Sequence, residues 1–178
     1  MEFADPPAPE FSRLMAADPA RTKPITEHLA ATDGECAQLA LRFGVEAIEY
    51  LGADCKLSTF SSANRMRLEV KFTAEIRQLC VITLEPVVAR IAGEFVREYA
   101  TSGIAEEPKE IIIDPDAEDP PEAIPEGGID AGEAIAEQLG LEIDPFPRAP
   151  GAEFPDHVES VQADHPFAQL KILKIDGE

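Results

Sequence analysis

The chain has 178 residues, of which 44% are hydrophobic, a size that suits one globular core and argues against two full-sized domains. Its 15 basic and 35 acidic residues give a formal net charge of -20, which disfavours binding to phosphate backbones and favours basic protein partners. The first residues lack the basic and apolar regions of a secretory signal, and no run reaches the ~18 apolar residues of a membrane span. We therefore expect a cytoplasmic protein.

Proline-rich and charged stretches divide the chain. Residues 1–10 are predicted to form a flexible tail and residues 153–178 a C-terminal extension, because neither stretch shows sustained periodicity. Between them, residues 11–152 are expected to form a single α+β domain. An acidic loop, residues 104–126, interrupts this domain with many Asp, Glu and Pro residues and the single base Lys109.

The first ordered element is predicted to be a helix over residues 33–43. Thr32 and Glu35 have the spacing of a capping box, apolar residues recur at helical spacing behind them, and Gly44 supplies a stop. An alternating pattern over residues 45–60 then predicts a strand, in which Gly52 marks a bulge or bend.

The clearest pattern in the chain is a strict alternation of apolar and polar residues from Met66 to Ile76. A second alternating stretch follows Pro86 and continues to about Tyr99. Two long strands with a short connection predict an antiparallel hairpin over about 65–100, with one face buried and one exposed.

A second helix is expected after the acidic loop. Asp130 and Glu133 have the spacing of a capping box, Ile135 and Leu139 share a face, and Gly140 is predicted to end the helix. The fold class is then α+β: an antiparallel sheet with a long central hairpin, one helix before it and one after it, and the acidic loop between.

No catalytic or metal-binding constellation emerges from the sequence. The histidines His28, His157 and His165 fall in segments predicted to be loop or tail, away from any nucleophile that they could activate. Thr83 stands where a C-x-x-C pair with Cys80 would place its second thiolate. We therefore expect neither an enzyme nor a metal or cofactor site.

Four bases, Arg65, Arg67, Lys71 and Arg77, lie on the predicted exposed face of the hairpin. They could contact RNA phosphates, or they could form cross-strand ion pairs on an ordinary solvated face. Glutamates interrupt the row and no aromatic residue is interleaved for base stacking, which favours the second interpretation. The acidic loop likewise has two interpretations, neutralising a lysine-rich partner or merely solvating the fold.

Several motifs together resemble one family. They are the run Gln78 to Val87 (QLCVITLEPV), the pair Ile129-Asp130, the run Glu137 to Leu141 (EQLGL), the run Asp144 to Gly151 (DPFPRAPG), and the two end motifs Phe11-Ser12-Arg13 and Pro166 to Lys171. In order and spacing these motifs resemble the YceD family in its alphaproteobacterial form.

The resemblance implies a role in the accumulation of large-subunit ribosomal RNA, and so in ribosome biogenesis, without a known catalytic activity. Many relatives carry C-x-x-C at the hairpin turn and a second cysteine pair later, whereas this chain has only Cys80 there and lacks the later pair. Family genes commonly lie beside the gene for a small basic protein of the large subunit, which implies that this protein is the partner. The acidic charge agrees with such a partner.

We therefore expect a non-enzymatic assembly factor that binds a basic ribosomal protein or an immature large-subunit particle, with no membrane and no small-molecule substrate. The alternative is a direct RNA-binding module that uses the row Arg65, Arg67, Lys71 and Arg77. Two stretches have identities that neither periodicity nor capping demands, although they could also serve only to shape a turn and brace the chain. These predicted binding residues are Gln78, Cys80, Thr83, Glu85 and Pro86, and Asp144, Pro145, Pro147 and Arg148.

Overall fold

The computed structural model describes residues 8–18, 20–60, 65–100, 121–125 and 127–154. The predicted tail (1–10), acidic loop (104–126) and C-terminal extension (153–178) lie largely outside these residues. The elements in chain order are β1 (Leu14–Met15), β2 (Ile25–Ala30), α1 (Asp33–Phe43), β3 (Ala47–Phe60), β4 (Arg65–Leu79), β5 (Pro86–Ala100), β6 (Glu122–Ala123), β7 (Ile129–Asp130) and α2 (Ala131–Glu142).

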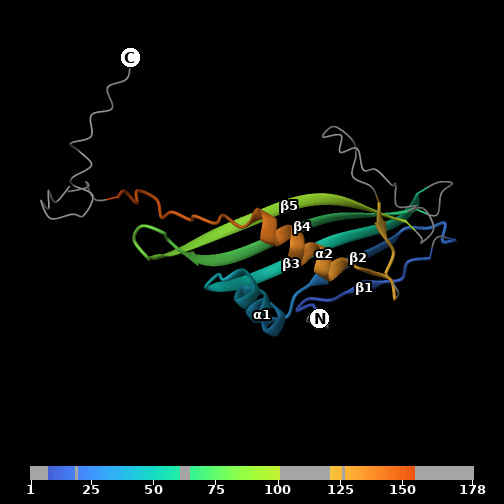
Figure 1. Ribbon diagram of the computed structural model, residues 1–178, viewed down its shortest axis with the longest axis horizontal. Coiled ribbons are helices and arrows are strands. Elements are labelled where there is room, and N and C mark those ends of the chain that lie inside the picture. Colours follow the sequence, from blue (N-terminus) through green and yellow to red (C-terminus); the bar gives the residue numbers. More distant parts are fainter. Residues whose placement is uncertain (1–7, 19, 61–64, 101–120, 126, 155–178) are drawn as a thin grey trace, which may run out of the picture.

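The described strands form a five-stranded sheet in the order β2-β3-β4-β5-β6 and a two-stranded sheet of β1 and β7 (Figure 1). All neighbours in the large sheet are antiparallel except β5 and β6. Its centre is the β4–β5 hairpin, whose register runs from Arg65 opposite Ala100 to Leu79 opposite Pro86. The predicted α+β fold with a long central hairpin is therefore confirmed.

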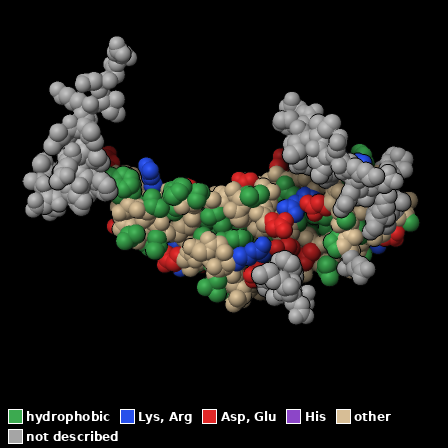
Figure 2. Space-filling view, in the orientation of Figure 1, with side chains coloured by type: hydrophobic (Ala, Val, Ile, Leu, Met, Phe, Trp, Pro, Cys, Tyr) green, Lys and Arg blue, Asp and Glu red, His purple; other side chains and the backbone are tan. Residues whose placement is uncertain are grey.

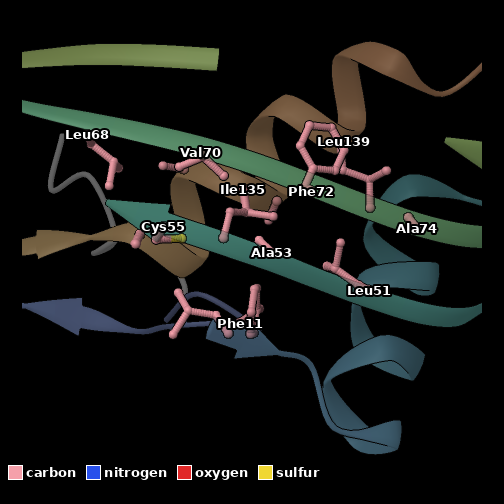
Figure 3. Close-up of a cluster of buried hydrophobic side chains, with 14 of the residues drawn as sticks. Phe11, Leu51, Ala53, Cys55, Leu68, Val70, Phe72, Ala74, Ile135 and Leu139 are labelled. Carbon is pink, nitrogen blue, oxygen red and sulfur yellow. The ribbon is translucent and has the colours of Figure 1, made fainter. Parts of the chain in front are cut away.

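One face of the sheet packs against both helices in a single core. The alternating residues of β4 point into this core, and Leu68, Phe72 and Ile76 are at most 2% exposed. Leu39 of α1 belongs to the same cluster. So do Ile135 and Leu139 of α2, which Figure 3 shows beside the core residues of the sheet. The opposite face of the sheet carries the charged residues, as period-two alternation predicts.

Helix α1 begins and ends where the sequence predicts. The Thr32 side chain accepts a hydrogen bond from the backbone N–H of Glu35, and the Glu35 carboxylate accepts one from that of Thr32, which completes the capping box. Gly44 ends the helix with a φ of 66°, in the left-handed region that glycine tolerates.

Strand β3 differs from its prediction at two points. It begins at Ala47, and its register slips between Ile48 and Tyr50, so the bulge precedes Gly52. The Tyr50 side chain lies over Gly52, where a Cβ would overlap its hydroxyl. The missing side chain makes room for the tyrosine to fold over the strand.

Helix α2 runs through Gly140 to Glu142, so the predicted stop at Gly140 is wrong. A Cβ at Gly140 would lie 3.1 Å from the Phe43 ring, so this glycine permits close packing against that ring. Asp130 caps the helix as expected, but the Glu133 carboxylate binds Arg42. The capping box is therefore only half formed, because the arginine of α1 offers Glu133 a charged partner.

The short strands were not predicted. Strand β2 pairs with β3 and includes His28, so the prediction that His28 lies in a loop is wrong. Strand β6 lies within the predicted acidic loop and pairs with Tyr99 and Ala100. Neither α1 nor α2, the helices in the described part of the chain, is long and apolar enough to span a membrane.

Candidate functional site

The turn between β4 and β5 is a closed loop of backbone hydrogen bonds. The N–H of Cys80 donates to the carbonyl of Glu85 at 2.8 Å, and the N–H of Leu84 donates to the carbonyl of Cys80 at 2.9 Å. Leu84 has a φ of 61°, a conformation that a branched side chain rarely adopts. The Thr83 hydroxyl accepts a hydrogen bond from the N–H of Glu85 at 3.4 Å. Thr83 and Glu85 therefore help to shape the turn.

The second predicted stretch folds back onto this turn. The chain after α2 runs alongside the hairpin toward its end (Figure 1). The carbonyl of Pro147 accepts a hydrogen bond from the N–H of Val81 at 2.9 Å, and the carbonyl of Asp144 accepts one from the Gln78 amide at 2.9 Å. The structure thus brings together the two stretches that the sequence singled out.

Cys80 lies where the two stretches meet. Its side chain is buried, and its sulfur accepts hydrogen bonds from the N–H groups of Ala149, Ile82 and Thr83 at 3.3, 3.4 and 3.4 Å. These donors, led by Ala149, lower the pKa of the Cys80 thiol to about 6. Backbone dipoles at this position thus favour the thiolate form of the sulfur.

Gln78 is the other buried polar residue at this junction. It is 7% exposed, and its Oε1 atom has no hydrogen-bond partner among the described residues. Gln78, Val81, Pro145 and Pro147 line a cleft of about 360 Å³ between the turn and the end of α1, together with Gly44, Val45, Glu46 and Leu79. The lining of the cleft is therefore mixed, with Glu46 and Gln78 among apolar residues.

The outer surface of the junction carries apolar side chains that are not among the predicted binding residues. Val81, Leu84 and Phe146 are 42%, 71% and 69% exposed, and Leu79 is 48% exposed. Figure 2 shows apolar side chains at the end of the molecule that carries the turn. One feature of the sequence could have indicated this surface. Large apolar residues occur in a turn and in a proline-rich segment, where neither helix packing nor strand packing requires them.

The other predicted site residues differ in how far they are exposed. Pro147 is buried, whereas Pro86, Asp144 and Pro145 are exposed. The guanidinium of the exposed Arg148 lies 5.9 Å from the centre of the Phe154 ring. Among the described residues, no group of three or more His, Cys, Asp or Glu side chains is placed to hold a metal ion.

The predicted basic row forms ion pairs with glutamates. Arg65 and Arg67 both approach Glu98, at 3.8 and 2.7 Å. Lys71 lies 3.4 Å from Glu94, and Arg77 approaches Glu46 and Glu49. Each base thus has a carboxylate of this chain beside it, the arrangement expected of an ordinary solvated strand face.

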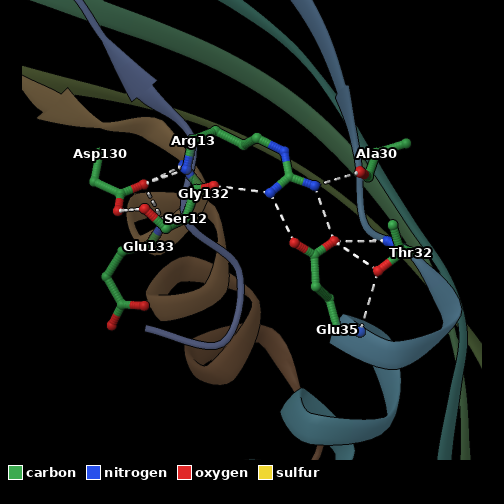
Figure 4. A network of polar contacts seen from close by, with 8 residues as sticks. All are labelled: Ser12, Arg13, Ala30, Thr32, Glu35, Asp130, Gly132 and Glu133. Carbon is green, nitrogen blue, oxygen red and sulfur yellow. Dashed lines mark hydrogen bonds and ion pairs between the residues drawn. The ribbon is translucent and has the colours of Figure 1, made fainter. Parts of the chain in front are cut away.

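A polar network joins the opening segment to both helices (Figure 4). Only its capping box, Thr32 with Glu35, was predicted from the sequence. The Arg13 guanidinium donates two hydrogen bonds to the Glu35 carboxylate, at 2.7 and 2.9 Å. The backbone N–H of Arg13 and the hydroxyl of Ser12 both donate to Asp130. Arg13 and Thr32 lower the pKa of Glu35 to about 2. Because these groups bind one another, we assign them to the fold and not to a binding site.

A known family matches the part of the chain that contains most of this site. The model of a family described as "Large ribosomal RNA subunit accumulation protein YceD" matches residues 68–174, more than half of the chain. The match includes the turn, the segment after α2 and α2 itself. No curated protein and no solved structure matches the chain.

Proposed function

The chain belongs to the YceD family of large ribosomal RNA subunit accumulation proteins, and we propose that it serves this role by binding. Its partner would be a basic ribosomal protein or an immature large-subunit particle, held until the ribosomal RNA is packed. No bond chemistry is required of the chain in this proposal.

The observation that carries the proposal is the exposed surface formed by the hairpin turn and the segment after α2. We call it the turn surface and define it by Val81, Leu84 and Phe146, which are 42%, 71% and 69% exposed. Neighbouring apolar side chains of this size, exposed on a braced backbone, are typical of a protein-binding site. Because hydrogen bonds hold the backbone of the turn in place, binding loses less conformational entropy.

Charge supports a basic partner. Glu85 and Asp144 are exposed beside the apolar residues of the turn surface, and Glu46 lines the cleft next to it. The chain as a whole carries a formal charge of -20. Acidic groups around an apolar centre would speed the encounter with a lysine-rich protein and disfavour naked RNA. The acidic segment 104–126 would add to the same field.

Direct RNA binding through Arg65, Arg67, Lys71 and Arg77 is the competing function. It would require these bases to exchange their glutamate partners for phosphates. Binding to naked ribosomal RNA fragments that weakens steeply with salt would favour it over our proposal.

A sedimentation experiment tests the proposal. The tagged chain should co-sediment with immature large-subunit particles in a sucrose gradient and not with the small subunit. The variant Val81→Ser/Phe146→Ser should lose this co-sedimentation while melting like the parent, because both side chains are exposed. Leu41→Ser is the matched control, since Leu41 is 75% exposed on α1 and is not part of the turn surface. Equal co-sedimentation of all three proteins would refute the role of this surface.

A further inference from the structure

The far edge of β5 is almost entirely without a strand partner. Strand β5 runs from Pro86 to Ala100, and β6 pairs only with Tyr99 and Ala100. Among the described residues, no strand pairs with the remaining edge, residues 86–98. Natural proteins usually shorten, bend or cover such an edge, because its backbone groups readily pair with another strand.

The side chains along this edge are self-complementary about Ala92. If a second copy pairs antiparallel with Ala92 opposite Ala92, Arg90 of each copy faces Glu94 of the other. Arg90 and Glu94 have side chains that are 84% and 74% exposed, and within their own chain they lie 2.9 Å from Glu75 and 3.4 Å from Lys71. Pairing across the axis would add to these contacts or exchange them. In the same register Val88 faces Val96, two valines that are 58% and 57% exposed.

On the core-facing side of β5, the same register places Ala89, a small residue, opposite Phe95, a large one. Ile91 would lie opposite Gly93, and the space over Gly93 is filled by the Phe72 ring of the same copy. Ala89, Ile91 and Phe95 are only partly buried in the single chain although they pack against its core. Moving the two-fold axis to Ile91 or Gly93 would place Arg90 opposite an uncharged residue. The charge match therefore favours Ala92 over these two axes.

We propose that two copies of this chain pair through β5, antiparallel and centred on Ala92, to form a continuous sheet across a two-fold axis. The same patch of each copy meets itself, which is how closed two-fold dimers are built. Opposite charges and apolar pairs directly across antiparallel strands both stabilise such an interface. Because paired strands run in opposite directions, the two turn surfaces would lie at opposite ends of the shared sheet.

Charge reversal tests the register. The full chain should show a reversible monomer–dimer equilibrium in sedimentation velocity, and Glu94→Arg should raise the dissociation constant about tenfold or more, because it sets Arg opposite Arg at both symmetric positions. The double variant Arg90→Glu/Glu94→Arg should restore the dissociation constant to within about threefold of the parent's value. Lys71→Gln is the control, because it removes the partner of Glu94 within the chain without altering the interface.

Cross-linking tests the axis. The native cysteines Cys36, Cys55 and Cys80 are buried, so an introduced surface cysteine can be oxidised selectively. Ala92→Cys should form an intermolecular disulfide, because the two Cβ atoms would lie about 5 Å apart. Thr73→Cys, directly beside Ala92 on β4, should not, because three strand spacings of about 4.8 Å would separate its copies. A monomer at all concentrations, a dimer unaffected by Glu94→Arg, or equal cross-linking of both variants would overturn the proposal.

Discussion

At the scale of single residues, Cys80 shows how backbone N–H groups can stabilise a buried sulfur. The N–H groups of Ala149, Ile82 and Thr83 point at the sulfur from two separate segments. Backbone dipoles that converge on a sulfur favour its charged form. Cys55 is the contrast, because burial within the sheet raises the pKa of its thiol to about 11.

This difference predicts a pH dependence of stability. The pKa of Cys80 falls from an ordinary value of 9.0 to about 6 in the fold, so its stabilising effect is complete above pH 9 and is lost as the pH falls through 6. The melting temperature of the parent minus that of Cys80→Ala should therefore shrink from pH 9 to pH 6. The same comparison with Cys55→Ala should stay level. A constant difference for Cys80→Ala would contradict a thiolate at this position.

At the scale of elements, the hairpin and the helices depend on a few close contacts. The Phe72 ring of β4 lies over Gly93 of β5, where a Cβ would come within 2.6 Å of the ring. Its edge meets Phe95 at a centroid distance of 6.4 Å. The side chains at the centre of the hairpin thus interlock across β4 and β5.

Removing the Phe72 ring should destabilise the fold. Phe72 is 2% exposed, and we expect Phe72→Ala to lower the free energy of unfolding by about 3 to 5 kcal/mol through the cavity it leaves. Phe146→Ala is the control, because Phe146 is 69% exposed and its removal should cost within about 0.5 kcal/mol. Urea unfolding of both variants would decide this. Equal stabilities would mean that Phe72 is not a core residue.

Two glycines, one in each helix, are predicted to respond in opposite ways to substitution by alanine. A Cβ at Gly132 of α2 would lie 2.4 Å from the carbonyl oxygen of Phe11, whereas one at Gly34 of α1 meets nothing within 4 Å. Gly132→Ala should therefore destabilise the fold by about 1 to 3 kcal/mol through overpacking. Gly34→Ala should stabilise it by about 0.5 to 1 kcal/mol, because alanine favours helix. Thermal melts that reverse this order would show that α2 does not pack against the opening segment.

The long elements were predictable from sequence because each has its own local signal. The alternation in β4 and the capping box of α1 need no information from distant residues. Strands β1, β6 and β7 have two residues each, so they are defined only by the segments that they meet. The end of α2 was mistaken because Gly140 serves packing against Phe43 and not capping.

The candidate site was predicted in part for the same reason. Unusual identities marked Gln78 and Cys80, but only the fold shows that both contact the segment after α2. The exposure of Leu84 and Phe146 was not predictable, because it depends on what the rest of the chain leaves uncovered. Likewise, the clamp of Arg13 on Glu35 joins residues that have no shared sequence pattern.

At the scale of the whole molecule, the two faces of the large sheet differ in packing and charge. The helices cover one face of the sheet, while ion pairs occupy the other. The hairpin carries the turn surface at one end, and β5 offers a free edge along the described sheet. In the function that we propose, the acidic charge of the chain would favour basic partners.

The most direct test of the account is the ratio of large- to small-subunit ribosomal RNA in cells depleted of this protein. We predict that the ratio falls on depletion and is restored by the parent and by Leu41→Ser. Val81→Ser/Phe146→Ser should fail to restore it although it accumulates to the same level. A ratio that does not change on depletion would contradict a role of this chain in large-subunit RNA accumulation.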